Sequence, residues 1–307
     1  MKISIDVIMP TFRLEEKYIL PVLRLPRPES AVFRFYLVAD NPAIIPSDNI
    51  KKLVDNETVF LYINEKNTGA SGTRRKAMDV SCGDWILMLD DDIVVPDNLL
   101  FTYAAAAARY PDEIGFLGLI NMPPPPNYFA RALQINGNTN IFSIAANQPS
   151  FTWGATANVM VRRSAVGKVR FSENYPRAGG GEDVDFFLQV RDRNNGRNFR
   201  SLPEAAVTHP WWDHARVNYR RTYNYAVGNS RIGRFNPSYT YRNLLNTPET
   251  VFVCLAAALI LWLAGAAWAW PVLLFAAGAL LAEAVATAVM VRKRFPGSPL
   301  PVIFHVI

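Results

Sequence analysis

Residues 85–96 of this 307-residue chain read Trp-Ile-Leu-Met-Leu-Asp-Asp-Asp-Ile-Val-Val-Pro, an apolar run that ends in three carboxylates. The run is too short to cross a membrane and is typical of a buried strand. Asp90 and Asp92 stand two residues apart, so in an extended chain both side chains leave on the same side and can bind one hard divalent cation. The alternative is an acidic turn that caps the helix expected to begin at Pro96 and Asp97. The position directly after a buried strand favours a metal site, whose remaining ligands would be the phosphates of a nucleotide.

Apolar runs of strand length alternate with polar, helix-compatible sequence along the chain. Further strands are expected at residues 3–9, 31–38, 59–63, 114–120, 157–161 and 206–208. This alternation predicts an α/β fold with a Rossmann-like, mostly parallel sheet and helices on both faces. Ligands of such sheets bind beyond the carboxyl ends of the strands. Thr11, Asp40, Asn67 and Asp90 all lie at those ends, so we expect them to share one site.

A glycine-bearing loop at residues 67–75 reads Asn-Thr-Gly-Ala-Ser-Gly-Thr-Arg-Arg and opens an expected helix. Free backbone N–H groups and a helix N-terminus suit a diphosphate, and Arg74 and Arg75 add positive charge. An ordinary helix start with solvated arginines fits the same residues. The loop alone does not decide between the two interpretations.

Three glycines at residues 179–181 precede a second expected helix that opens with Glu182 and Asp183. The helix dipole favours ionised carboxylates there, so we expect Asp183 to be charged and able to accept a proton at neutral pH. Ordinary capping explains acids at a helix start as well. The glycines favour a catalytic interpretation, because they give the backbone freedom to bend and let a substrate come close.

His209 follows the short strand expected at residues 206–208. A lone histidine is usually structural. Beside an acidic metal cluster, a neutral imidazole that completes the coordination shell is an equal alternative.

Most of the chain's apolar excess lies at its C-terminal end. Between residues 251 and 291 only Pro271 and Glu283 interrupt the apolar sequence strongly. Each half reaches the roughly 20 residues that a membrane helix needs. We therefore expect a cytosolic domain at residues 1–245 and a two-helix transmembrane hairpin at residues 246–307. A carboxylate inside such a hairpin should turn from lipid toward the partner helix or a second copy of the chain.

Positively charged residues indicate how the chain is oriented in the membrane and which partner its basic surface binds. The N-terminus enters a strand without a signal-peptide pattern, and Arg292, Lys293 and Arg294 follow the second apolar helix, so the catalytic domain is expected on the cytosolic face, at the plasma membrane if the source is prokaryotic. The net charge of +6 fits nucleic acid or a membrane surface. A group of arginines near the first apolar helix favours membrane lipids over nucleic acid. These are Arg216, Arg220, Arg221, Arg231, Arg234 and Arg242.

The order of these motifs resembles that of glycosyltransferase family 2, the inverting sugar transferases with the GT-A fold, across residues 5–234. A first strand ending in Pro-Thr, an acid after the second strand, an Asn-Gly-Arg loop, an Asp-X-Asp motif and a Glu-Asp pair come in the family's order. Arg75 stands where the family more often has Asn. Residues 218–223 also depart from the Gln-X-X-Arg-Trp motif of the family's processive synthases, so we expect single sugar addition rather than polymerisation.

The resemblance implies roles for individual residues. Mn or Mg is expected on Asp90 and Asp92, with His209 as a further ligand, and Asp183 of the pair with Glu182 is the expected catalytic base. Expected donor contacts are Pro10, Thr11, Asp40, Asn67, Gly69, Arg74 and Asp91. Expected acceptor contacts are Trp153, Gly154 and Trp211.

The resemblance also implies an enzyme that moves one sugar from a nucleotide-diphosphate sugar to a hydroxyl group, with inversion at the anomeric carbon. The apolar hairpin points to a lipid-linked glycan as acceptor and to polysaccharide biosynthesis at the cell envelope. A polyprenyl-phosphate sugar synthase is an alternative, because its phosphate nucleophile is already ionised and needs no strong base. A catalytically silent membrane scaffold that binds nucleotide sugars is another. Homo-oligomer formation stays open.

Overall fold

The computed structural model describes residues 2–239 and 245–306. Its contacts divide the chain into two compact units. The first unit comprises Met1–Pro124 and Thr139–Tyr239, and the second comprises Pro125–Asn138 and Thr240–Ile307. Arg242, one of the arginines assigned to the membrane surface, lies outside the described residues.

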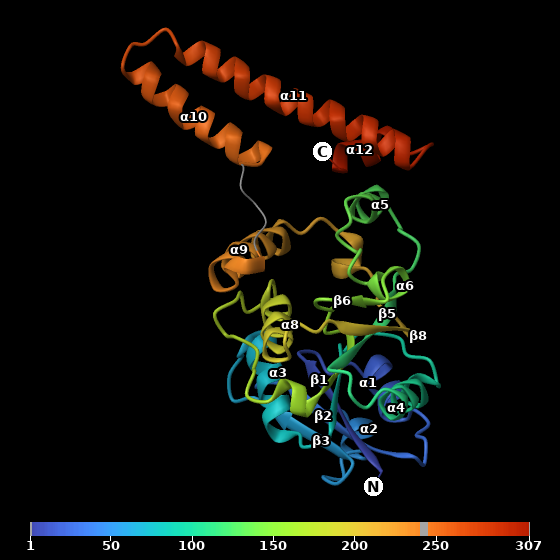
Figure 1. Ribbon diagram of the computed structural model, residues 1–307. Coiled ribbons are helices and arrows are strands. Elements are labelled where there is room, and N and C mark those ends of the chain that lie inside the picture. The colour runs from blue at the N-terminus through green and yellow to red at the C-terminus, as the bar shows by residue number, and fades with distance from the viewer. Residues whose placement is uncertain (1, 240–244, 307) are drawn as a thin grey trace. The chain divides into compact units, whose positions relative to one another are not determined.

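The first unit contains an eight-stranded sheet in the order β3-β2-β1-β4-β7-β5-β8-β6 (Figure 1). The strands are β1 (Ile3–Thr11), β2 (Ala31–Ala39), β3 (Val59–Ile63), β4 (Trp85–Leu89), β5 (Gly115–Asn121), β6 (Ser150–Phe151), β7 (Asn158–Arg162) and β8 (Phe199–Thr208). Parallel pairing joins β3, β2, β1 and β4, and also β5 and β8. Strand β7 lies antiparallel between β4 and β5, and β6 is antiparallel to β8. The predicted α/β fold is confirmed, with antiparallel strands in the half of the sheet beyond β4.

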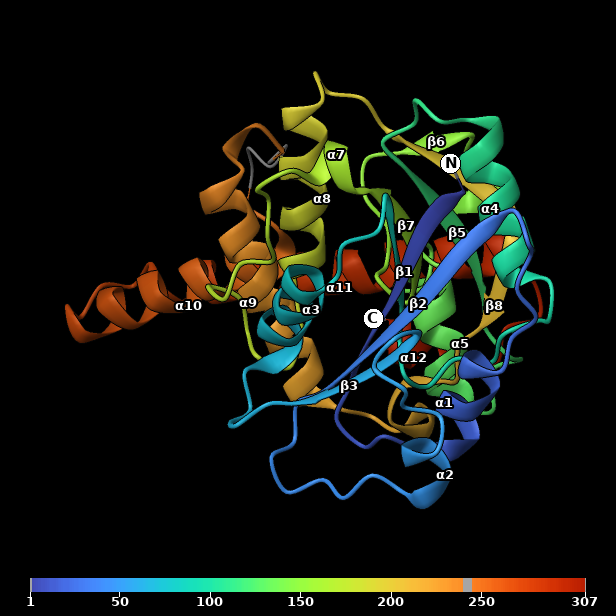
Figure 2. The same cartoon turned by 90° about the horizontal axis from the view of Figure 1, so that it is seen from below.

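Helices cover both faces of this sheet, as Figure 2 shows. One face carries α1 (Glu16–Leu23), α2 (Asp48–Lys51) and α4 (Leu99–Arg109). The other carries α3 (Gly69–Val80), α7 (Arg163–Val166) and α8 (Glu182–Arg193). Alternation along the strands builds both cores, because Leu87 and Leu89 of β4 pack in the first cluster while Ile86 and Met88 pack in the second. All five residues of β4 are apolar and buried, so the carboxylates of Asp90, Asp91 and Asp92 come only after the strand ends.

Helix α9 (Tyr219–Phe235) packs against α8 and the glycine run before it. Gly179, Gly180 and Gly181 have φ of 90°, 133° and 90°, a region that side chains rarely adopt. A Cβ atom on Gly228 of α9 would overlap the carbonyl group of Gly180. Two backbones therefore touch here, and the contact needs glycine on both sides.

Short elements complete the first unit: α6 (Ile144–Asn147), the 3₁₀ helix η1 (Trp212–Ala215) and the 3₁₀ helix η2 (Pro237–Tyr239). The second unit contains α5 (Tyr128–Ile135), α10 (Thr247–Leu263), α11 (Ala269–Arg294) and α12 (Leu300–Val306). Its apolar cluster joins Ala132 and Ile135 of α5 to Val291 of α11 and to Val302 and Ile303 of α12.

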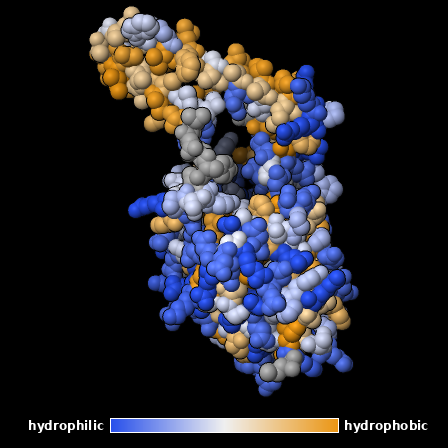
Figure 3. All heavy atoms as spheres, in the orientation of Figure 1, coloured by the Kyte–Doolittle hydropathy of each residue, from blue (hydrophilic) through white to orange (hydrophobic). Residues whose placement is uncertain are grey.

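Helices α10 and α11 pair with each other, and their surface is largely hydrophobic on the face that Figure 3 shows. Among the described residues, α11 is the one helix whose length of 26 residues and apolar composition would let it cross a membrane, while α10 is apolar but has 17 residues. Thr247 of α10 donates a hydrogen bond from Oγ1 to Oε2 of Glu283 at 3.3 Å. The prediction that Glu283 faces the partner helix is confirmed.

The contact of α9 with the glycine run makes a prediction about stability. Gly228→Ala should destabilise the first unit by about 1–3 kcal/mol, because the new methyl group has no space beside the Gly180 carbonyl. Gly278→Ala is the matched control in another helix, since nothing lies within 4 Å of a Cβ there, and it should gain about 0.5–1 kcal/mol of helix propensity. Thermal unfolding of the purified full chain measures both. Equal melting temperatures for the two variants would contradict the close packing of α9.

Candidate active site

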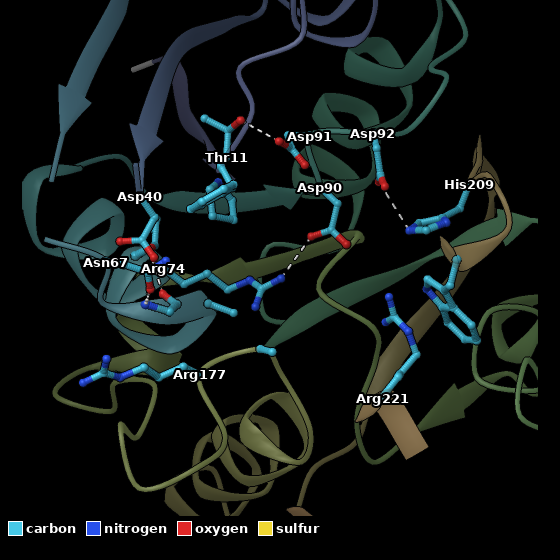
Figure 4. Close-up of a pocket in the computed structure, with 17 residues that line it drawn as sticks. Thr11, Asp40, Asn67, Arg74, Asp90, Asp91, Asp92, Arg177, His209 and Arg221 are labelled. Carbon is cyan, nitrogen blue, oxygen red and sulfur yellow. Dashed lines mark hydrogen bonds and ion pairs between the residues drawn. The ribbon is translucent and has the colours of Figure 1, made fainter. Parts of the chain in front are cut away.

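An open cavity of about 460 Å³ lies at the carboxyl ends of the parallel strands (Figure 4). It gathers residues that come from sequence positions far apart. The lining consists of Pro10, Thr11, Phe12, Asp40, Asn67, Gly69, Ala70, Thr73, Arg74, Asp90, Asp91, Asp92, Arg177, Ala178, His209, Trp212 and Arg221. The residues that the resemblance implied for donor contact and for the metal all line this cavity, whereas Arg75 and the expected catalytic pair, Glu182 and Asp183, lie outside its lining.

Arg74 joins the two acidic motifs of the chain. Its side chain is buried, and Nη2 donates a hydrogen bond to Oδ1 of Asp90 at 3.0 Å while Nη1 lies 3.6 Å from Oε1 of Glu182. Burial opposes the charged guanidinium, but Asp90, Glu182 and Asp183 together raise the pKa of Arg74. Arg74 is thus a permanent cation held between the carboxylates after β4 and those that open α8.

Asp90, Asp92 and His209 form a candidate metal centre, with one ligand atom from each lying within 4.8 Å of the others. Nδ1 of His209 lies 2.6 Å from the carbonyl oxygen of Pro210, which can only accept, so Nδ1 carries the hydrogen. Nε2 then faces Oδ1 of Asp92 at 3.4 Å. With Nδ1 occupied by this hydrogen bond, Nε2 is the ring nitrogen that faces the two carboxylates. Two carboxylates and an oriented imidazole fit a divalent cation such as Mn.

Asp91, the middle residue of the cluster, turns toward β1 instead. Thr11 Oγ1 donates to Asp91 Oδ2 at 2.5 Å and accepts a hydrogen bond from the Leu14 amide at 2.9 Å. Burial raises the pKa of Asp91, and the Thr11 hydrogen bond opposes that shift. Asp91 therefore fixes the ends of β1 and β4 relative to each other.

Asp40 holds the glycine-bearing loop in place. Its Oδ1 accepts hydrogen bonds from Asn64 Nδ2 at 2.7 Å and from the Thr68 amide at 2.8 Å, and its Oδ2 accepts from the Gly69 amide at 2.7 Å. The Ala70 amide donates to the carbonyl oxygen of Arg177 at 3.1 Å. The first two amides of α3 are thus already bonded within the protein. The expectation of free N–H groups for a diphosphate fails at these two positions. Of the two arginines of the loop, Arg74 lines the cavity, whereas Arg75 lies outside the lining and pairs with Asp79 and Glu173.

Asp183 differs from the sequence expectation. Burial, and after it the neighbouring charge of Glu182, raise the pKa of Asp183 to about 7, against the opposing effect of Arg74. The helix dipole was expected to keep this carboxylate ionised, but it is outweighed by the loss of solvation. Glu182 itself is buried and accepts a hydrogen bond from the Gly180 amide at 2.6 Å, so it holds the glycine run. Asp183 is left half-protonated near neutral pH.

The three residues expected to bind the acceptor lie outside the cavity lining. Trp211 is buried, and its indole N–H donates to the carbonyl oxygens of Pro123 and Pro124 at 3.0 and 3.3 Å. Gly154 packs against Leu117, and Trp153 packs between two core clusters. Their role in acceptor binding stays a prediction.

The structure adds lining residues that the sequence did not suggest for this site. Arg221, which was assigned to lipid headgroups, faces the cavity, pairs with Asp213 at 3.0 Å and lies over the ring of Trp212 at 5.5 Å. Trp212 lines the cavity in place of its neighbour Trp211. Arg177 follows a proline in an irregular stretch, where no periodicity could have revealed it. The sequence held one indication for Arg221, which is a charged residue in the first turn of the helix that Asn218 caps.

The fold is that of the GT-A glycosyltransferases. Residues 6–170, more than half of the chain, match the model of the family described as Glycosyl transferase family 2. The chain belongs to that family, and it is an enzyme that transfers a glycosyl group.

Individual proteins are more distant. An uncharacterized glycosyltransferase of Methanocaldococcus jannaschii is 32% identical over 100 residues, which is 31% of this chain and 34% of that protein. The succinoglycan biosynthesis protein ExoM of Rhizobium meliloti is 27% identical over 217 residues, or 68% of this chain and 67% of ExoM. The solved structure of the mannosyltransferase PcManGT from Pyrobaculum calidifontis, in complex with GDP-Man and Mn2+, superposes with a TM-score of 0.57 at 14% identity, covering 100% of this chain and 84% of PcManGT.

The raised pKa of Asp183 predicts a cost in stability. The folded protein keeps the proton up to about pH 7 while the unfolded chain releases it near pH 4, so the free energy of unfolding falls as pH rises between these values. Asp183→Asn cannot lose a proton. It should therefore be more stable than wild type by roughly 1–4 kcal/mol at pH 8 and equal to it at pH 4. Asp192→Asn, at an exposed position of the same helix, is the control in thermal unfolding. A gain that does not depend on pH would contradict the assignment.

Proposed function

We propose that the protein is an inverting glycosyltransferase that moves one sugar from a nucleotide-diphosphate sugar to a hydroxyl group of a lipid-linked glycan. The observation that carries the proposal is the bridge of Arg74 between Asp90 and Glu182. It holds the candidate metal centre beside the candidate base, Asp183. A donor diphosphate and an acceptor hydroxyl need those two groups at neighbouring positions.

The donor side of the site suits a diphosphate. Asp90, Asp92 and His209 would hold Mn or Mg, which when bound neutralises the leaving diphosphate. Arg177 and Arg221 add positive charge to the cavity. PcManGT was solved with GDP-Man and Mn2+, and TarS of S. aureus, which superposes with a TM-score of 0.52 at 15% identity over 83% of this chain and 71% of TarS, was solved with UDP-GlcNAc. These neighbours support a nucleotide sugar as donor.

The acceptor side needs a base on the face of the sugar opposite the leaving group. Asp183 would take the hydroxyl proton as the new bond to the anomeric carbon forms and the bond to the diphosphate breaks, which inverts that carbon. A pKa of about 7 suits this task, because it balances the fraction of free carboxylate against its basicity at neutral pH. Glu182 and Arg74 position the base without contacting the reacting atoms.

The second unit supports a membrane location. Helix α11 has the length of a membrane span, and its last turn carries Arg292, Lys293 and Arg294. We therefore propose a cytosolic catalytic domain at residues 1–245 and an anchor at residues 246–307, at the plasma membrane in a prokaryote. The hydrogen bond from Thr247 to Glu283 gives the carboxylate a partner within one chain, and homo-oligomer formation stays open. The likeness to ExoM, a succinoglycan biosynthesis protein, supports a role in polysaccharide biosynthesis.

A polyprenyl-phosphate sugar synthase is the second candidate, and one observation favours it. Asp183 is half-protonated near pH 7 in the protein without substrate, and an ionised lipid phosphate would attack without needing that base. Both enzymes differ from a silent scaffold, which would bind nucleotide sugar without turning it over.

Binding of the donor tests the metal centre. Asp92→Ala should abolish Mn-dependent binding of GDP-mannose and UDP-GlcNAc in calorimetry, because one of the two carboxylate ligands is lost. Asp97→Ala, an exposed carboxylate just after the cluster, should bind as wild type does. Unchanged, Mn-dependent affinity in Asp92→Ala would refute the proposed centre.

Transfer tests the base and separates the two candidate enzymes. Asp183→Asn should keep donor affinity and lower transfer to a hydroxyl acceptor by about two orders of magnitude or more. Wild-type transfer should rise as pH increases toward 7 and then level off, because the free carboxylate is the active form. Near wild-type transfer by Asp183→Asn to a polyprenyl phosphate would support the synthase and count against the hydroxyl acceptor.

A further inference from the structure

The segment that contains α9 has an unusual charge. Residues 216–239 include five arginines and no aspartate or glutamate. Two of these arginines have partners in the first unit, since Arg221 pairs with Asp213 and Arg231 donates to the carbonyl oxygen of Asn174. Within residues 2–239 and 245–306, no carboxylate forms an ion pair with Arg216, Arg220 or Arg234. The segment therefore presents uncompensated positive charge to its surroundings.

Helix α9 has two faces of different character. At 100° per residue, Arg221, Gly228 and Ile232 share the inner face, which meets the cavity and α8. Tyr219 and Tyr223 lie on the opposite face and are 83% and 68% exposed. Arg234 shares this outer face and Arg220 flanks it, both also exposed. Amphipathic tyrosines beside arginines suit the boundary between water and lipid headgroups.

We propose that the outer face of α9 rests on an anionic phospholipid surface, so that this helix docks the catalytic unit onto the membrane. Charge complementarity selects lipid phosphates as the occupant, because the face carries cations and no carboxylate. Continuity of the chain supports the same occupant. The apolar helix α10 begins at Thr247, only 12 residues after α9 ends at Phe235, and a capping box at Asn246 fixes that start. This inference rests on the membrane location proposed above.

The docked helix sets how far the active site lies from the bilayer. An α-helix with its side chains is about 10–12 Å across. Arg221 on the inner face lines the cavity, so the side of the cavity that α9 forms lies about one helix diameter above the lipid phosphates. The acceptor class follows from this distance. Its reactive group must lie close to the headgroup plane, as in a lipid phosphate or a lipid carrying a short glycan, and not at the end of a long polymer.

Accessibility of a spin label tests the docking in the full chain. Tyr223→Cys and the control Ile45→Cys, 84% exposed in the first unit, are each made after Cys82 and Cys254, the two native cysteines, are replaced by serine. In nanodiscs of phosphatidylglycerol and phosphatidylcholine, the label at position 223 should be protected from a water-soluble nickel relaxation agent, and the label at position 45 should not. Protection should weaken in pure phosphatidylcholine and at high salt, because screening removes the attraction of the arginines.

A charge-removal variant shows whether the arginines cause the protection. Arg216→Gln, Arg220→Gln and Arg234→Gln combined should reduce protection at position 223 about twofold or more in the anionic nanodiscs. Equal access of the agent to positions 223 and 45 overturns the proposal. Protection that is unaffected by lipid charge but accompanied by dipolar coupling between labels also overturns it, in favour of a second copy of the chain. Donor binding by the same variants is measured in parallel, so loss of docking with donor binding intact refutes this inference and not the proposed function.

Discussion

The architecture of the site depends on one buried cation. Arg74 projects from α3 and lies between Asp90, which ends the central strand β4, and Glu182, which opens α8. Removing one member of such a buried pair leaves a charge without compensation, typically at a cost of about 3–5 kcal/mol. The pairs therefore hold the carboxylates in place as well as neutralising them. Arg74 therefore links the carboxylates that line the cavity to the acidic pair that opens α8.

The carboxylate of Asp183, next to Glu182 and Arg74, is destabilised by its surroundings in its ionised form. Burial and the charge of Glu182 raise the pKa of Asp183, so ionising this candidate base lowers the stability of the folded protein. Close packing of two backbone segments holds the start of α8, and with it Asp183, in this buried position. The glycine run before α8 adopts positive φ throughout, and Gly228 of α9 presses against it. A side chain at either place would move the backbone that carries Asp183.

The sequence predicted the fold and many of the residues that line the cavity, but it did not predict the protonation of the acidic groups. Strand periodicity and the carboxylates after β4 were enough to place Asp40, Arg74 and the Asp90 cluster at one edge of the sheet. The raised pKa of Asp183 could not be predicted from the sequence, because the loss of solvation that causes it depends on tertiary packing. Nor did the sequence place Arg177 and Arg221, whose position follows from the path of loops and of α9. Charge alone could not distinguish an arginine in a cavity from one at a membrane surface.

Helix α9 shows why that distinction matters, because it uses arginines in both ways. Its inner face is built from Gly228 and Ile232 for close packing, with Arg221 reaching the cavity and Asp213. Its outer face carries long, amphipathic side chains, and none of the described carboxylates pairs with its arginines, Arg220 and Arg234. A substitution on the inner face changes the geometry of the active site, whereas one on the outer face changes only what the helix rests on. In the docking proposed above, one helix therefore forms a side of the cavity with one face and the contact with lipid with the other.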